Sequence, residues 1–212
     1  TTTVDGTNIT NSYTPGKTSV TVKKAWADAE NQDGKRPEDI KVQLYADGEK
    51  KGEEVTLNAG NNWTYTWENL DQKKAKNDIA YTVKEVKVPE GYASVVTGNS
   101  EKGYTITNSY TPEITEVSGT KTWKDADDQD GKRPESIMVR LWANGVEKAS
   151  KKVTVEDNWK YSFAGLPKYE KGTEIIYTVT EDAVSDYTTT VDGTNITNSY
   201  TPGKTSVTVK KA

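Results

Sequence analysis

The sequence predicts an all-β protein made of tandem immunoglobulin-like β-sandwich modules. Three observations support this fold class. Apolar and aromatic side chains alternate with polar ones, short Gly-containing turns separate the alternating segments, and the whole pattern occurs twice. Alternation places apolar side chains on one face of a strand. Several such strands within about 90 to 100 residues favour an antiparallel sandwich, and we find no convincing helix.

Internal repeats set the organisation of the chain. Residues 1–25 recur identically at 188–212. Within that period lie two related units, which share Gln-Asp-Gly-Lys-Arg-Pro-Glu at 32–38 and 129–135, and Tyr-Thr-Val-x-Glu at 81–85 and 177–181. Self-similarity at a fixed period is the signature of a repeat array. The sequence is therefore interpreted as a window on a longer array.

The repeats predict four segments. Residues 1–14 are expected to be the C-terminal strand of a preceding repeat, 17–112 a first module, 115–202 a second module, and 203–212 the first strand of the next repeat. Proline and glycine fall at each boundary, where they interrupt strand pairing. Because these joints are short and contain proline, they favour a fairly stiff rod over a flexible coil.

Five alternating segments are predicted to face the core of each unit, and Asp47-Gly48, Asn144-Gly145 and Asp192-Gly193 provide turns between strands. In the first unit the core-facing residues are Val20, Val22, Lys24 and Trp26; Ile40, Val42 and Leu44; Trp63, Tyr65 and Trp67; Tyr81, Val83 and Glu85; and Ile106, Asn108 and Tyr110. In the second they are Val117, Gly119, Lys121 and Trp123; Ile137, Val139 and Leu141; Trp159, Tyr161 and Phe163; Tyr177, Val179 and Glu181; and Ile196, Asn198 and Tyr200.

Composition argues against several classes of function. The net charge of -4, with interspersed signs and no basic stripe, disfavours nucleic acid as a partner. No apolar run reaches the roughly 18 residues of a membrane span. The chain has no cysteine and no histidine, which removes thiolate nucleophiles, histidine bases and most zinc sites. We expect no cofactor, no metal and no small-molecule substrate.

Three polar residues in each unit interrupt the apolar face. They are Lys24, Glu85 and Asn108 in the first unit, and Lys121, Glu181 and Asn198 in the second. Charged residues are almost never fully buried unless they are paired. A lone lysine on a strand is usually solvated and a lone asparagine usually caps a turn, but the same triplet occurs in phase in both units, which argues against chance.

The triplet suggests a reaction between side chains. Burial lowers the pKa of a lysine and raises that of a carboxyl group, so the pair can exist as a neutral amine and a neutral acid. The amine could then attack the Asn carbonyl and displace ammonia, while the carboxyl group carries the proton. A buried salt bridge that never reacts is the intermediate alternative, and it would add little net stability.

The ordered motifs Lys-x-Trp, Gln-Asp-Gly-Lys-Arg-Pro-Glu, Tyr-Thr-Val-x-Glu and Ile-Thr-Asn-Ser-Tyr-Thr-Pro also carry a family resemblance. The chain resembles the CnaB-type repeat domains (collagen adhesin B-region) of Gram-positive cell-surface adhesins over essentially its whole length. The resemblance implies inverse-immunoglobulin sandwiches with intramolecular isopeptide bonds, Lys24 to Asn108 assisted by Glu85 and Lys121 to Asn198 assisted by Glu181.

The resemblance further implies a monomeric stalk of an adhesin, located outside the cell and anchored to the cell wall. The stalk would resist protease and force and would present a separate region that binds a ligand such as collagen. Formation of each bond is a single event, so the chain would not be a turnover enzyme. The rival interpretation is a module that binds a host protein through an exposed sheet edge.

Some residues depart from the pattern or offer an alternative. Lys23 precedes Lys24 but should point outward by alternation. Asn11 and Lys211 match reactive positions in incomplete units, so we expect them to be unreacted unless another copy supplies the missing strands. Asp125, Asp127, Asp130 and Gly131 resemble a calcium loop, but the glycine and the closing glutamate are misplaced for an EF-hand. A solvated acidic loop is favoured there.

Overall fold

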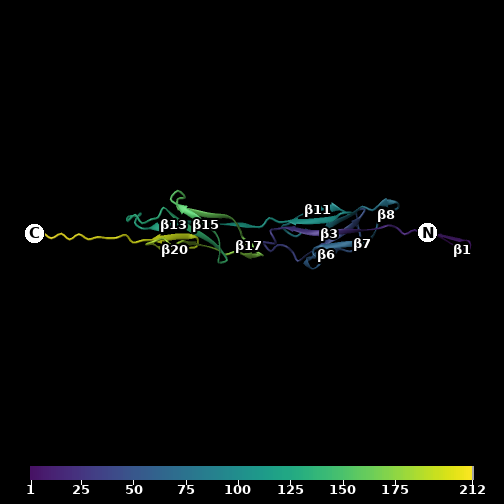
Figure 1. Cartoon of the computed structure of the whole chain (residues 1–212), viewed down its shortest axis with the longest axis horizontal. Helices are drawn as coiled ribbons and strands as arrows, with labels where there is room; N and C mark the ends of the chain where they lie inside the picture. Colours follow the sequence, from purple (N-terminus) through teal and green to yellow (C-terminus); the bar gives the residue numbers. More distant parts are fainter. Residues whose placement is uncertain (212) are drawn as a thin grey trace. The chain divides into compact units, whose positions relative to one another are not determined.

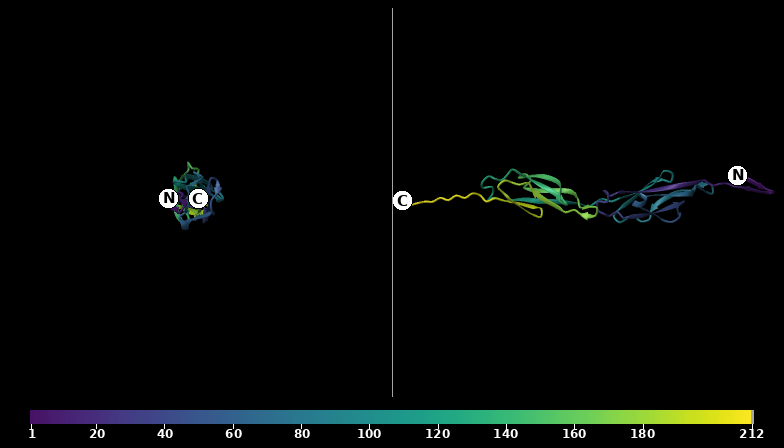
Figure 2. Two further views of the ribbon diagram at one scale, coloured as in Figure 1. Left: turned by 90° about the vertical axis from the view of Figure 1, so that its right-hand side faces the viewer. Right: turned by 60° about the horizontal axis from the view of Figure 1, so that its bottom comes forward.

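The structure is a computed structural model that describes residues 1–211, and it consists almost entirely of β-strands (Figure 1). The chain divides into two compact units, one spanning Thr1–Thr111 and the other beginning at Pro112. In Figure 2 the first unit is coloured from purple to teal and the second from teal through green to yellow. The described residues contain one short 3-10 helix, Ala59–Asn61, and no α-helix, as the alternating pattern predicts.

Two sheets form the first unit. The strand order of one sheet is β11-β12-β3-β7, and that of the other is β10-β4-β5 with β6 also paired to β4. A separate small hairpin joins β8 to β9. The strands are β3 (Lys17–Ala27), β4 (Asp39–Ala46), β5 (Glu49–Lys50), β6 (Val55–Asn58), β7 (Thr64–Asp71), β8 (Lys73–Lys74), β9 (Asn77–Asp78), β10 (Tyr81–Glu85), β11 (Ala93–Asn99) and β12 (Gly103–Ser109).

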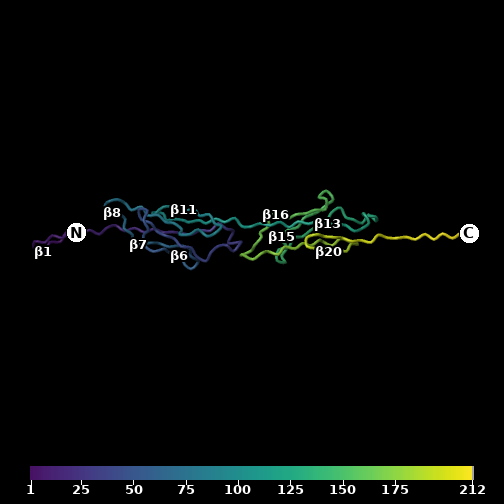
Figure 3. The backbone as a smooth tube through the Cα atoms, turned by 180° about the vertical axis from the view of Figure 1, so that it is seen from behind, coloured from purple at the N-terminus to yellow at the C-terminus, as the bar shows by residue number. Residues whose placement is uncertain are grey.

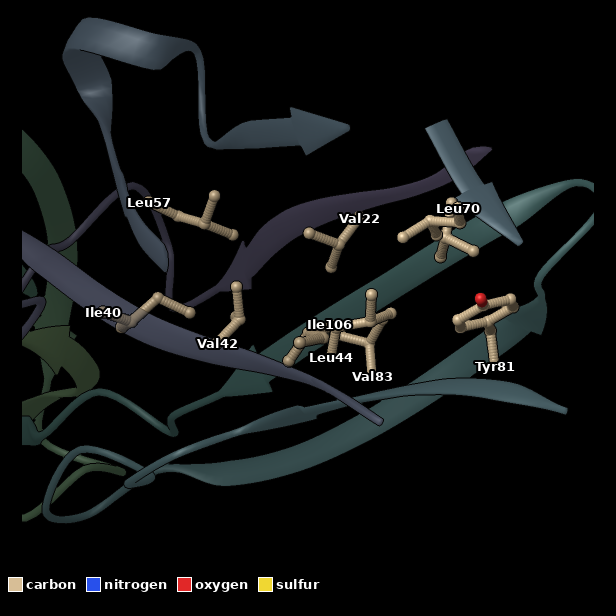
Figure 4. Close-up of a cluster of buried hydrophobic side chains, with 10 residues drawn as sticks. Val22, Ile40, Val42, Leu44, Leu57, Leu70, Tyr81, Val83 and Ile106 are labelled. Carbon is tan, nitrogen blue, oxygen red and sulfur yellow. The ribbon is translucent and has the colours of Figure 1, made fainter. Parts of the chain in front are cut away.

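The core of the first unit lies between these sheets. Val22 of β3 and Ile106 of β12 come from one sheet and meet Val42 and Leu44 of β4 from the other (Figure 4). All four side chains are fully buried. The predicted alternation on these strands is therefore confirmed, and it explains the sandwich because each sheet can bury only one face.

The first and last strands of the sandwich, β3 and β12, are direct neighbours. β3 and β12 run parallel, and their register places Lys24 opposite Ile106 and Trp26 opposite Asn108. Since residues two apart on a strand share a face, Lys24 and Asn108 lie diagonally on the core side of the same sheet. The topology thus joins residues that are far apart in the sequence.

The second unit repeats this architecture. Its sheets have the strand orders β16-β13-β21-β20 and β15-β14-β19. β13 runs parallel to β21, with Lys121 opposite Ile196 and Trp123 opposite Asn198. The strands are β13 (Ile114–Lys124), β14 (Ser136–Ala143), β15 (Val146–Thr154), β16 (Lys160–Pro167), β17 (Tyr169–Glu170), β18 (Thr173–Glu174), β19 (Tyr177–Glu181), β20 (Thr188–Asp192) and β21 (Asn195–Ser199).

One predicted core strand is wrong in part. Trp63 lies just before β7 and packs against the core as predicted, but Tyr65 is 39% exposed. Its counterpart Tyr161 in the second unit is buried. The difference lies across the ladder, because Tyr65 faces Val22 whereas Tyr161 faces Gly119. Glycine leaves room for the tyrosine ring, and valine does not.

The two ends of the chain lie outside the two β-sandwiches. β1 (Thr2–Asp5) and β2 (Asn8–Asn11) form an exposed hairpin in which Ile9 is 69% exposed. Residues 203–211 carry no strand and can be followed as the yellow end of the tube in Figure 3. Asn11 and Lys211 are both exposed. The assignment of these ends to neighbouring repeats stays a prediction. No helix within residues 1–211 is long and apolar enough to span a membrane.

Candidate functional site

The first unit brings Lys24, Glu85 and Asn108 into one buried cluster. Lys24 is 3% exposed and Asn108 is fully buried. The Asn108 amide donates from Nδ2 to Glu85 Oε1 at 2.9 Å, and Ser94 Oγ donates to Glu85 Oε2 at 2.8 Å. Lys24 Nζ donates to the backbone carbonyl of Ile106, two residues before Asn108, at 3.4 Å. The Glu85 carboxylate therefore contacts the Asn108 amide, and the Lys24 amine reaches β12, the strand that carries Asn108.

Local strand geometry explains why the three residues meet. Lys24 follows Val20 and Val22 at period two on β3, and Asn108 follows Ile106 on β12. Glu85 continues the alternation of Tyr81 and Val83 on β10, in the opposite sheet. Each polar side chain is in phase with buried apolar ones, so folding of the core buries Lys24 and Asn108 and half-buries Glu85.

The second unit holds the matching residues in a different arrangement. Lys121 Nζ lies 2.8 Å from Oε1 and 3.0 Å from Oε2 of Glu181, with hydrogen-bond geometry at Oε2. Both side chains are fully buried. Thr189 Oγ1, the counterpart of Ser94, donates to Glu181 Oε2 at 3.1 Å. The glutamate thus contacts the amide in one unit and the amine in the other.

The two asparagines are incompletely satisfied. Asn108 Oδ1 and both amide atoms of Asn198 have no hydrogen-bond partner within the described protein, although both residues are fully buried. Burying an amide without hydrogen bonds costs roughly 2 to 7 kcal/mol. Such groups in a native structure require an explanation, and here they belong to the asparagines that the sequence pairs with Lys24 and Lys121.

Burial makes both lysines easier to deprotonate. It lowers the pKa of Lys24 to about 8, against the opposing charges of Glu85 and Asp28, and the positive charge of Arg36 adds slightly to the decrease. Burial also lowers the pKa of Lys121, opposed by its hydrogen bond and charge interaction with Glu181. A lower pKa increases the fraction of neutral amine, which is the nucleophilic form.

A second set of residues lies around Lys24, and of these the core pattern identified Trp26 but not Asp28, Arg36 or Tyr92. Lys24 Nζ lies 4.1 Å from the ring centroid of Trp26, and Arg36 Cζ lies 5.4 Å from the same ring. Arg36 pairs with the buried Asp28, which also accepts from Tyr92 Oη. The available signal was the duplicated Gln-Asp-Gly-Lys-Arg-Pro-Glu segment, which contains the arginine.

The acidic loop of the second unit is not simply solvated. Asp125 is buried and pairs with Arg133 through both carboxylate oxygens, at 3.0 and 2.7 Å, whereas Asp127 is exposed. The expectation of a solvated loop is therefore wrong for Asp125, because the arginine compensates its charge. Within residues 1–211, no group of three or more acidic side chains is arranged to hold a metal ion.

Comparison with known proteins gives consistent matches. The Cna protein B-type domain matches residues 20–109 and 117–199. A collagen adhesin of Staphylococcus aureus is 55% identical over 211 residues, which is 100% of this chain and 18% of that protein. The crystal structure of two B repeat units of the collagen-binding protein of Staphylococcus aureus matches with 54% identity and a TM-score of 0.85, covering 95% of this chain and 54% of that one. Neither description is of an enzyme. The chain therefore belongs to the Cna protein B-type domain family.

Proposed function

We propose that this chain is part of the stalk of a bacterial surface adhesin, in which each module cross-links itself once through a Lys-Asn isopeptide bond. The bonds join Lys24 to Asn108 and Lys121 to Asn198, and Glu85 and Glu181 assist them. The observation that carries the proposal is that each unit contains a buried lysine and a buried, under-satisfied asparagine together with a glutamate, which contacts the asparagine in the first unit and the lysine in the second.

The reaction balances without any further reagent. The neutral Lys24 amine attacks Cγ of Asn108, so that an Nζ–Cγ bond forms and the Cγ–Nδ2 bond breaks. The proton lost by the amine is transferred through Glu85 to the departing nitrogen, which leaves as ammonia. Glu85 ends the reaction unchanged. The two arrangements of the glutamate, on the amide in one unit and on the amine in the other, fit a group that exchanges protons with both.

The product explains the burial of these polar groups. An amide bond replaces a charged amine and a primary amide with one neutral group, which costs less to bury. It also joins β3 to β12, the first and last strands of the module. Tension applied between the ends would then pass through the covalent bond, and most of the module would remain unloaded.

The surrounding protein is inferred from the relatives. The matched collagen adhesin suggests a location on the surface of a Gram-positive cell. This chain corresponds to 18% of that protein, so we assign ligand binding to another region. Anchoring to the cell wall, a monomeric state and the stiffness of the array belong to the same proposal.

Intact mass spectrometry tests the cross-links directly. Each bond releases one ammonia, so the mass should be about 17 Da below the sequence mass per module and about 34 Da below it for the chain. Glu85→Ala should restore about 17 Da and leave the second unit as an internal control. A mass equal to the sequence mass would refute the cross-link. Retention of a host protein by the two modules in a pull-down would refute a purely structural stalk.

A further inference from the structure

The duplicated segments 32–38 and 129–135 have no role in the reaction described above. We propose that each segment is a register clamp, which holds the first strand and the last hairpin of its module in the alignment that brings lysine, glutamate and asparagine together. The clamp consists of Arg36, Asp33, Asp28, Tyr92 and Tyr110 in the first unit, and its role rests on the proposed cross-linking function.

The first arm of the clamp joins the end of β3 to the start of β11. Asp28, one residue beyond β3, accepts from Arg36 Nε at 3.0 Å and from Arg36 Nη2 at 2.6 Å. Tyr92 Oη donates to the same carboxylate at 2.9 Å. Tyr92 directly precedes β11, two residues before Ser94, which holds Glu85 and lies opposite Asn108. The arm therefore reaches the glutamate through one strand.

The second arm fixes the end of β12. Tyr110 Oη donates to Asp33 Oδ2 at 2.9 Å, and the Tyr110 backbone N–H donates to Ala27 O at 3.0 Å. Tyr110 is two residues beyond Asn108, and Ala27 is the last residue of β3. Both reactive strands are thus tied to one segment just beyond their reactive residues.

The aromatic rings complete the connection. Trp26 packs edge-to-face on Tyr92 with ring centroids 5.2 Å apart, and Tyr92 packs on Tyr110 at 5.4 Å. Trp26 also lies against the Lys24 amine. Displacement of either tyrosine would therefore shift the ring that covers the nucleophile.

The second unit reproduces every contact. Arg133 pairs with Asp125, Tyr187 Oη donates to Asp125 Oδ2 at 3.0 Å, and Tyr200 Oη donates to Asp130 Oδ2 at 2.9 Å. Tyr187 lies two residues before Thr189, which holds Glu181 and pairs with Asn198. Asp130 Oδ2 also accepts from the Gly203 backbone N–H at 2.9 Å. The duplicated segment thus makes the same contacts in both modules, which favours a shared role.

Register matters because the reaction tolerates little displacement. A slip of one residue turns a side chain to the other face of the sheet, and a slip of two moves it by about 6.6 Å along the strand. Reacting atoms need to approach within about 3 to 3.5 Å, and a misplacement of about 1 Å can cost about 100-fold in rate. The contacts of Asp28 and Tyr110, a few residues beyond Lys24 and Asn108, limit such slips close to the reacting side chains.

The test removes the clamp hydroxyls and keeps the rings. Tyr92→Phe/Tyr110→Phe should slow bond formation in the first unit by about tenfold or more, measured as the growth of the 17 Da loss after synthesis and assigned to a unit by peptide mapping. The matched control is Tyr81→Phe/Tyr104→Phe, which removes two hydroxyl hydrogen bonds of 2.9 and 2.8 Å from the same unit. This control should react at the wild-type rate.

A stability measurement separates positioning from simple destabilisation. Both double variants are placed in an Asn108→Ala background, where the first unit cannot react, and their urea midpoints are compared. Similar midpoints with slow bond formation only in the clamp variant support the clamp. Wild-type kinetics in the clamp variant, or equal slowing in the control, would overturn it. If Tyr92→Phe/Tyr110→Phe does not fold, Tyr92→Phe alone is measured in the same way. Absence of the 17 Da loss from the wild-type chain would instead refute the proposed function.

Discussion

The reactive lysine of the first unit must give up its charge, and this requirement predicts a pH dependence. In an Asn108→Ala chain Lys24 stays a free amine with a pKa of about 8 in the folded unit, against 10.5 when exposed. Between these values the unfolded chain binds more protons, so the stability of the first unit should rise with pH. Urea unfolding from pH 7.5 to about 9.5 measures this rise before unfolded tyrosines begin to titrate.

The control for this experiment is Lys24→Met/Asn108→Ala, which removes the titrating amine. Glu85, Asp28 and Arg36, the groups whose charges act on Lys24, are all present in this control. The control should therefore show a flat stability. An equal slope in both chains would contradict assignment of the pH dependence to Lys24.

The buried aspartate of the second unit predicts acid sensitivity. Its hydrogen bonds with Arg133 lower the pKa of Asp125 to about 2, against an ordinary value of 3.8. A depressed carboxyl pKa contributes stability that is present above about pH 4 and is lost as the pH falls towards 2. In an Asn198→Ala chain, the urea midpoint of the second unit should fall over this range.

Asp125→Asn in the same chain should lower the stability of the second unit by about 3 kcal/mol at pH 5, since it unpairs Arg133, and should reduce the acid dependence. An unchanged acid dependence would contradict the assignment to Asp125.

The residues of the site differ in how well the sequence predicts them. Lys24, Glu85 and Asn108 were predictable because each interrupts a period-two apolar pattern, and the duplicated triplet repeats the signal. Asp28 and Tyr92 lie beyond the strand patterns, and tertiary contacts place them: Asp28 accepts from Arg36, and Tyr92 donates to Asp28. Periodicity could not identify them, although the duplicated segment marked their partner.

Among the elements, β13 and β16 form a contact at which the two units differ. Tyr161 is buried opposite Gly119, and its hydroxyl donates to the Thr194 backbone carbonyl in the turn between β20 and β21. Alternation alone predicted the same facing for Tyr65 and Tyr161. It could not show that Val22 leaves no space for the first ring, because that outcome depends on the volume of the residue across the ladder.

Gly119→Ala should disrupt the last hairpin of the second unit. A Cβ at this position would lie 2.0 Å from the Thr194 backbone oxygen, so the turn before β21 would have to move. We expect destabilisation of about 1 to 3 kcal/mol and a larger fraction of chains that lack the second bond, measured by urea unfolding and peptide mapping. Tyr161→Phe should not rescue the variant, since the Thr194 backbone oxygen and the ring carbon Cζ of residue 161 would still obstruct the added Cβ. Full cross-linking of Gly119→Ala at the wild-type rate would contradict this geometry.

For the whole molecule, the parallel pairing of first and last strands determines what a cross-link protects. The bond between Lys24 and Asn108 would close a loop of 108 − 24 = 84 residues. By analogy with a disulfide, closing a loop of this size adds about 4.5 kcal/mol through the entropy of the unfolded chain. The bond between Lys121 and Asn198 closes a loop of 198 − 121 = 77 residues and adds a similar amount. Both units should therefore resist heat and protease more than their unreacted forms do.

Single-molecule force spectroscopy tests this protection in the two units separately. Because the bond bypasses the enclosed loop, the wild-type chain should show no unfolding extension from residues 25–107 or 122–197. Glu85→Ala should release the first loop and lengthen the chain by about 300 Å, at about 3.6 Å per residue, whereas Glu181→Ala should release about 280 Å. The two lengths identify which unit has opened, and the unmodified unit serves as the control in each experiment. Extensions of both lengths in the wild-type chain would mean that no covalent bond closes either loop, which would remove the mechanical basis of the stalk.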